Sequence, residues 1–152
     1  VNGVPVHGRM HPEMGHILLR RQAGDGFRGA CSFHGDCAEG LLSGPALAAR
    51  FGTPAETVAA DDPRWDAPVA DLAQLLVTLI HSFAPNRILV GGGVGMGAGA
   101  MLARATALLP GLLGGYYPDL DQAALAALVT QPALGDQAGP LGAIAVGLNA
   151  LR

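Results

Sequence analysis

The stretch from His7 to Gly40 is the feature that most limits how this chain can fold. It holds four of the five histidines and both cysteines of a 152-residue chain. It is also rich in glycine, and its apolar residues follow neither the 3.6-residue period of a helix nor the alternation of a strand. A segment of this kind cannot bury an apolar face of its own. The sequence therefore predicts a structured loop that is held in place by something other than a hydrophobic core.

Metal ligands are the first candidate for holding this loop. Cys31, His34 and Cys37 form a C-x2-H-x2-C pattern, in which one tight turn can direct two thiolates and an imidazole at a common centre. A closed, structural zinc site needs a fourth ligand, and the spacing allows either His11 or His16. The alternatives are two unpaired cysteines among surface histidines, or a disulfide between them. The disulfide would leave the histidines without a role.

Two glutamates lie within the same stretch. Glu13 stands three residues before His16, and Glu39 stands two residues after Cys37. Carboxylates on a loop that a metal holds rigid can accept hydrogen bonds from a polyhydroxyl ligand. A glutamate in a polar loop is also often simply solvated, so the two acids alone do not decide between these possibilities.

Turn and capping signals mark the first half of the chain. Asn-Gly within the segment 1–6 indicates a hairpin turn. Ser43 and Pro45 predict the start of a short helix that ends near Phe51, before Gly52. Thr53, with a glutamate three residues later, predicts a capping box for another short helix.

Helix and strand signals alternate in the second half. Apolar residues recur at helical spacing, a buried-type apolar run follows, and a triple glycine leads into a Gly/Ala-rich segment. The expected elements are a helix over 69–83, a buried strand over 87–91, a helix to about Leu109, a helix over 124–128, a strand over 129–131 and a helix over 139–151. This alternation is typical of an α/β fold.

The glycine turn at 91–93 has two physical interpretations. Glycines after a buried strand let the backbone approach a flat or anionic ligand, such as a nucleotide, and the start of the next helix favours phosphate. Tight packing of strand against helix also uses glycine. The segment 135–139 is similar, because it can cap the last helix or contribute to a nucleotide site.

Composition excludes several classes of function. The formal net charge is −3 and lysine is absent, which argues against a nucleic-acid or anionic-membrane surface and against a P-loop. Glycines break the apolar run 88–103, so no membrane span is predicted. Only 14% of the residues are charged, against about 25% in a typical soluble domain. This deficit indicates a chain that packs against a partner subunit or a further domain.

The start of the chain suggests a location and a boundary. It carries no basic segment followed by an apolar run, so we predict no secretory signal and expect a cytoplasmic protein. In a reducing compartment, clustered cysteines indicate metal binding or catalysis more than a disulfide. Because Val1 opens the chain as if within a strand, we expect a piece of a longer protein.

Four motifs together resemble one family. HPEMGH at 11–16 and CSFHGDCAEGLLSGPA at 31–46 are followed by RILVGGGV at 87–94 and ALGDQAGPLGA at 133–143. Their sequence and order are similar to the ROK family of bacterial sugar kinases, and the C-x2-H-x2-C loop resembles its fructokinase branch. The resemblance spans nearly the whole chain.

The resemblance implies an actin/hexokinase-like (ribonuclease-H-like) α/β fold and ATP-dependent phosphorylation of fructose to fructose 6-phosphate, with Mg-ATP as co-substrate, in a homodimer. It implies His16 as the fourth ligand of a structural zinc ion, in place of His11. The residues to which it assigns roles are Glu13, His16 and Glu39 for the sugar, His16, Cys31, His34 and Cys37 for zinc, and Pro45, Gly91, Gly92 and Gly93 for the nucleotide.

The resemblance also implies what this sequence lacks. Relatives carry an N-terminal lobe with an Asp-x-Gly-x-T phosphate loop, a catalytic aspartate and a glycine-rich phosphate turn, and none of these motifs occurs here. Residues 1–152 are therefore expected to form the C-terminal lobe, with no catalytic residue of their own and no turnover when alone. The alternatives are a sugar-sensing transcriptional regulator of the same family and a free-standing zinc-binding module.

Overall fold

The structure is a computed structural model that describes residues 5–97 and 99–151. The hairpin turn predicted at Asn2 and Gly3 lies outside the described residues. The helices are α1 (Ala38–Leu42), α2 (Gly44–Phe51), α3 (Asp66–Phe83), α4 (Gly92–Gly97), α5 (Gly99–Leu113), α6 (Gln122–Leu128) and α7 (Ala138–Ala150), and the strands are β1 (Ile88–Leu89) and β2 (Val129–Thr130). Short 3-10 turns lie at Met14–His16, Ala55–Thr57, Pro63–Trp65 and Gly135–Gln137. The α/β class predicted from the sequence is confirmed.

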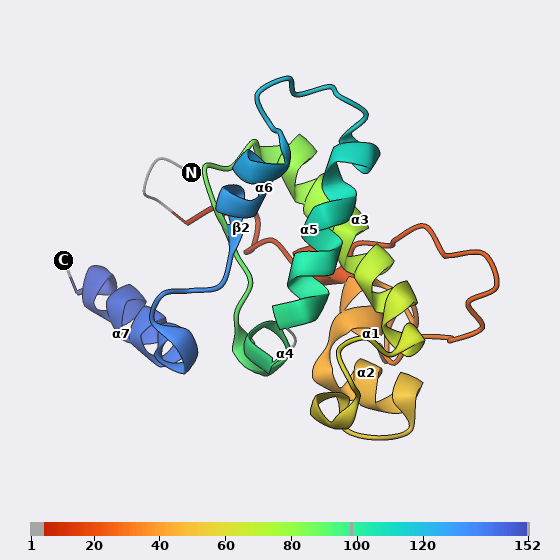
Figure 1. Cartoon of the computed structure of the whole chain (residues 1–152). Helices are drawn as coiled ribbons and strands as arrows, with labels where there is room; N and C mark the ends of the chain where they lie inside the picture. Colours follow the sequence, from red (N-terminus) through yellow and green to blue (C-terminus); the bar gives the residue numbers. More distant parts are fainter. Residues whose placement is uncertain (1–4, 98, 152) are drawn as a thin grey trace.

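The hydrophobic core lies mainly between α3 and α5, which pack side by side (Figure 1). Leu76 and Ile80 of α3 and Leu109 of α5 are almost fully buried. These residues recur at the three- and four-residue spacing that puts them on one face of each helix, as the sequence predicted for α3. Trp65 and Phe51 extend the core toward α2, with their rings 4.8 Å apart.

Helix α5 continues one turn beyond its predicted end at Leu109. It includes Pro110 and stops at Leu113, before Gly114, whose φ of 61° is left-handed. Leu109 and Leu113 are both buried, so the apolar face extends through the additional turn. That packing outweighs the usual cost of proline inside a helix.

The sheet is small. Among the described residues, β1 and β2 form a parallel pair with Ile88 opposite Val129 and Leu89 opposite Thr130. Both strands were predicted, but β1 is shorter than expected and the side chain of Leu89 is 58% exposed. The prediction of a fully buried strand is wrong there, because a two-stranded sheet cannot cover both of its faces.

Helix α2 has the ends that its sequence predicts. The Ser43 side chain accepts a hydrogen bond from the Ala46 N–H, which satisfies one of the free donors of the first turn. Pro45 lies in that first turn, and Gly52 ends the helix with a φ of 70°. The helix therefore starts and stops at residues that local chemistry specifies.

The capping box predicted at Thr53 is wrong. Pro54, with a φ of −54° and a ψ of 134°, stands at the N-cap position of a single 3-10 turn, Ala55–Thr57. The Thr53 hydroxyl is hydrogen-bonded to the Thr57 hydroxyl at 2.9 Å and caps no helix. The segment is too short to continue, because the chain turns to bury Val58 against the core.

Helix α7 lies away from the helical core (Figure 1). The side chains of Leu141, Ile144, Val146 and Leu148 are all between 44% and 63% exposed. The helix was predicted from its apolar composition, but the described part of the chain packs little against it. No helix within the described ranges has both the length and the hydropathy to cross a lipid bilayer.

Candidate functional site

The metal loop, residues 28–37, carries both cysteines and is folded back on itself by short backbone hydrogen bonds. The N–H of Cys31 donates to the carbonyl of Gly35 at 3.1 Å, and the N–H of Gly35 donates to the carbonyl of Cys31 at 2.9 Å. Gly29 has a φ of 79°, and a Cβ there would clash with the Gly35 carbonyl. Glycine at this position is therefore required for the turn that brings the side chains together.

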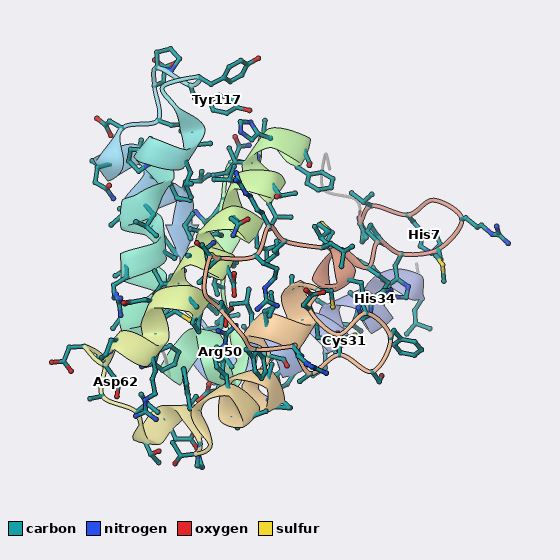
Figure 2. All side chains as sticks on the ribbon, turned by 90° about the vertical axis from the view of Figure 1, so that its right-hand side faces the viewer. His7, Cys31, His34, Arg50, Asp62 and Tyr117 are labelled. Carbon is teal, nitrogen blue, oxygen red and sulfur yellow. The ribbon has the colours of Figure 1, made fainter. Side chains whose placement is uncertain are left out.

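The side chains of His16, Cys31, His34 and Cys37 converge at this turn. Their potential ligand atoms all lie within 4.8 Å of one another. The Sγ atom of Cys31 is 3.8 Å from Nδ1 of His16 and 3.8 Å from Nδ1 of His34. The Sγ atom of Cys37 is 3.6 Å from Nδ1 of His16. Figure 2 shows Cys31 and His34 together at one edge of the molecule.

These distances suit a tetrahedral metal ion. With zinc–sulfur bonds of about 2.3 Å and zinc–nitrogen bonds of about 2.0 Å, a tetrahedron has edges of roughly 3.3–3.8 Å between ligand atoms. The three sulfur–nitrogen distances lie at the upper end of this range, and the four ligand atoms, which lie within 4.8 Å of one another, would close in slightly around the ion. Two thiolates and two imidazoles are also the donor set of many structural zinc sites. The residues present therefore fit zinc.

The two thiols have different environments. Backbone N–H groups of His34 and Phe33 stabilise the thiolate of Cys31 and lower its pKa to about 7. Burial raises the pKa of the Cys37 thiol, and the neighbouring Cys31 sulfur raises it further. Because metals bind the thiolate form, a cation at this point would favour the deprotonated state of both.

One of the two predicted acids adjoins the cluster. The Oε2 atom of Glu39 lies 3.9 Å from Nε2 of His16, the ring nitrogen that does not face the cysteine sulfurs. Glu39 is in the first turn of α1, which begins directly after Cys37. Its carboxylate is about half exposed and so remains open to a ligand.

The side chains of His11 and Glu13 lie outside this arrangement. Nε2 of His11 lies 2.5 Å from Oε1 of Glu13, and both side chains are more than half exposed. Spacing alone allowed His11 as the fourth metal ligand, but it is not among the residues that converge. Glu13 contacts His16 through the backbone, since its carbonyl accepts a hydrogen bond from the His16 N–H at 3.0 Å. Its carboxylate is directed at His11 instead of the cluster.

A pocket of about 590 Å³, separate from the four candidate metal ligands, lies beside the first half of α2. Pro45 and Gly93, two of the residues predicted to bind a nucleotide, both line it. Gly93 has open space where a Cβ would be, so the backbone is accessible from the pocket. The remaining lining residues are Gly44, Ala48, Pro54, Ala55, Glu56, Trp65 and Val94.

The other two glycines of the predicted nucleotide turn do not line the pocket. Gly92 has a φ of 77°, which only glycine adopts freely, and it begins α4. A Cβ on Gly91 would lie 3.1 Å from the ring of Pro132. In the described structure these two positions therefore serve the strand-to-helix turn itself.

Sequence reasoning missed two pocket residues, Glu56 and Trp65. Trp65 is the only tryptophan of the chain, but its 3-10 turn is too short to show any periodicity. Glu56 was assigned to a capping box that does not form. Only the tertiary arrangement brings both residues beside Pro45.

Comparison with known proteins decides the family. Residues 1–149 match the family described as the ROK family. This chain is a member of the ROK family. The match covers the metal loop, the helical core and almost all of α7, so the resemblance read from the sequence motifs is confirmed. ROK membership also implies an actin/hexokinase-like fold, to which the α/β architecture corresponds.

Several curated proteins similar to this chain are named fructokinases. The chain is 37% identical to the fructokinase of Zymomonas mobilis over 153 residues, which are 99% of this chain and 50% of the relative. It is 34% identical to the fructokinase of Pediococcus pentosaceus over 148 residues, or 96% of this chain and 49% of the relative. The fructokinase of Lactococcus lactis subsp. cremoris is 43% identical over 94 residues, which are 61% of this chain and 32% of the relative. The chain thus spans about half the length of the first two relatives.

Proposed function

We propose that this chain provides the sugar-binding, metal-binding and nucleotide-binding part of an ATP-dependent fructokinase, which transfers the γ-phosphoryl group of ATP to the 6-hydroxyl of fructose. The observation that carries the proposal is that Glu39 lies next to a group of four candidate metal ligands in a chain of the ROK family. The names of the similar proteins support fructose as the substrate.

The proposed metal is zinc, held by His16, Cys31, His34 and Cys37. With four protein ligands the ion would have no open position, so its role would be structural. It would fix the loop and the orientation of the His16 ring, which the adjacent Glu39 carboxylate faces.

The sugar is proposed to bind against Glu13, His16 and Glu39. An ionised carboxylate accepts strong hydrogen bonds from hydroxyl groups, and two such acids can orient a polyol. Glu39 already lies beside His16, while Glu13 would have to leave its contact with His11. Fructose hydroxyls would offer Glu13 the donors that replace this partner.

The nucleotide is proposed to occupy the pocket beside α2, with Pro45 and Gly93 against it and Gly91 and Gly92 shaping the turn that presents Gly93. The pocket has the volume of a typical small-molecule site, about 300–1,000 Å³. Mg²⁺ would arrive with ATP. We further propose that the protein is a homodimer, as the motif resemblance implies, and that it works in the cytoplasm.

Phosphoryl transfer also needs a base that accepts the proton of the attacking hydroxyl. No residue of this chain is assigned that role. We therefore propose that residues 1–152 alone bind ligands without turning them over, and that the activity belongs to a protein in which this chain is joined to an N-terminal lobe.

The test is Glu39→Gln in such a two-lobed protein. Losing a charged acceptor for a sugar hydroxyl should cost about 1.5–3 kcal/mol, or roughly 10- to 150-fold in kcat/KM for fructose. The zinc content should stay the same. Asp119→Asn, an exposed change in the loop after α5, serves as the matched control and should leave the kinetics unchanged.

Two results would contradict the proposal. Unchanged kinetics in the Glu39→Gln protein would remove Glu39 from the sugar site. Binding of fructose without any phosphorylation by the two-lobed protein would favour the sugar-sensing regulator instead.

A further inference from the structure

A second cluster of charged side chains lies beneath the metal loop, apart from the four candidate ligands. Its charges alternate in sign, and it runs from the second turn of α3 to the metal loop itself. Its members, in spatial order, are Asp71, Arg50, Asp25, Arg21 and Asp36.

The centre of this network is the guanidinium of Arg50, in the last turn of α2. Its Nη1 atom donates to both carboxylate oxygens of Asp25 at 3.0 Å, and its Nη2 atom donates to Oδ2 of Asp71 at 3.4 Å. The same group lies over the ring of Phe27, 4.6 Å from its centre. Arginine is planar and rigid at its head, so these contacts fix one orientation of the segment that carries Asp25 and Phe27.

Arg21 extends the network to the metal loop. Its Nη2 atom donates to Oδ2 of Asp25 at 2.7 Å and to the carbonyl of Phe27 at 2.6 Å. Its Nη1 atom donates to Oδ2 of Asp36 at 3.4 Å. Asp36 directly precedes Cys37 in the chain and follows His34 by two residues. A displacement of the Arg21 side chain would therefore also displace two of the four candidate ligands, His34 and Cys37.

Helix α3 also holds the backbone next to Arg21. The side chain of Gln74 accepts a hydrogen bond from the Arg20 N–H at 3.0 Å and donates one to the Arg20 carbonyl at 2.9 Å. Gln74 stands three residues after Asp71, on the same face of the helix. The segment that leads to the metal loop is thus connected to α3 in two ways. Gln74 binds the backbone of Arg20, and Asp71 is linked to Asp25 through the guanidinium of Arg50.

Stability alone does not account for these charges. Asp71 is fully buried and Arg50 is nearly so, and taking charges out of water costs several kcal/mol for each ion. Burial raises the pKa of Asp71 to about 6 despite the attraction of Arg50 and Arg21. The cost of burying this carboxylate therefore exceeds what its partners return.

We propose that Arg50 and Arg21 are positioning residues, which hold the metal loop at a fixed distance and angle from α2 and α3. Through Asp25 and Asp36 they would set the geometry of the ligands around the metal. Arg50 and Pro45, which lines the proposed nucleotide pocket, are both in α2. The network therefore also fixes the position of the proposed metal site relative to the proposed nucleotide site. This inference rests on the proposed zinc site.

Cobalt(II) substitution of the 152-residue protein tests the inference, because the absorption bands of cobalt report the geometry of its ligands. In Arg50→Met, which leaves every ligand in place, we expect altered bands and about a tenfold loss of zinc affinity in competition with a chelator. Arg50→Lys keeps the positive charge but loses the planar guanidinium that binds Asp25 and Asp71 together. For this variant we expect a spectrum between those of the wild type and Arg50→Met. Arg104→Met is the matched control, because it breaks the ion pair of Arg104 with Asp66 between α5 and α3, outside the network. It should leave spectrum and affinity unchanged.

The possible failures are distinguishable. A lower unfolding temperature in Arg50→Met with wild-type bands and wild-type affinity would show a purely structural network and overturn the inference. If Arg50→Met does not fold, Arg21→Met replaces it, since Arg21 is one-quarter exposed and touches the metal loop directly. A wild-type protein that binds no zinc and gives no tetrahedral cobalt spectrum would instead overturn the zinc site and this inference with it.

Discussion

The metal loop and the α3–α5 core are held by different kinds of interaction. In the core, leucine and isoleucine side chains at helical spacing bury one another. The free energy of unfolding is therefore shared among many side chains, each of which contributes a small part. In the metal loop and the segment that leads to it from His16, few apolar side chains are buried, and order depends on a small number of polar contacts between specific partners. A core of this kind tolerates small changes gradually, whereas a loop of this kind should lose its structure when one link is removed.

Removal of the metal is predicted to have the largest effect and to separate the two regions. Structural zinc contributes about 10 kcal/mol or more to small domains. Dialysis against a chelator should therefore speed amide hydrogen exchange in the loop by roughly 100-fold or more, with α3 and α5 keeping their protection. Equal loss of protection in loop and core would contradict the division between them.

A cavity in the core should have the converse effect. Leu109 is fully buried between the helices, and Leu109→Ala should lower the free energy of unfolding by about 2–5 kcal/mol in urea titrations. The zinc content of the folded protein should not change. Leu148→Ala, on the exposed face of α7, is the control and should cost much less. A loss of zinc in folded Leu109→Ala would show that the loop depends on core packing.

The smallest predicted effect concerns Asp71, where the core meets the charge network. Burial raises its pKa from the ordinary 3.8 to about 6, in an environment that also contains Arg50, Arg21 and Asp25. Between these pH values the folded state binds more protons than the unfolded state, so the contribution of Asp71 to stability falls as the pH rises from about 4 to 6.

Asp71→Asn removes this dependence. The free energy of unfolding of the wild type, measured relative to Asp71→Asn, should fall by about 1–3 kcal/mol between pH 4 and pH 6.5. Titration of the metal ligands affects both proteins and cancels in the difference. A difference that stays constant would mean that the pKa of Asp71 is not raised by folding, and a rising difference would mean that Asp71 is stabilised as a carboxylate.

The two regions also differ in how much the sequence reveals. Local chemistry specifies the helical part: Ser43 and Gly52 bound α2 as predicted, and the apolar spacing before Pro85 predicts α3. Helix α1 was missed, because five residues are too few to display a period. The capping box at Thr53 was a local pattern that tertiary packing overrode.

In the loop, the sequence indicates which residue types gather but not how they are supported. The C-x2-H-x2-C spacing points to a metal, yet it leaves His11 and His16 equal as candidates. The partners of Arg50 are 21 and 25 residues away in the chain. No spacing rule predicts such contacts, so the network and the pocket lining of Trp65 emerge only from the fold.

Metal analysis of the protein purified without chelator, combined with X-ray absorption at the zinc edge, tests the central claim most directly. We predict about one zinc per chain, with two sulfur ligands near 2.3 Å and two nitrogen ligands at about 2.0–2.1 Å. A metal-free protein with a Cys31–Cys37 disulfide, or a site that keeps its fourth ligand after His16→Ala and loses it after His11→Ala, would contradict the account.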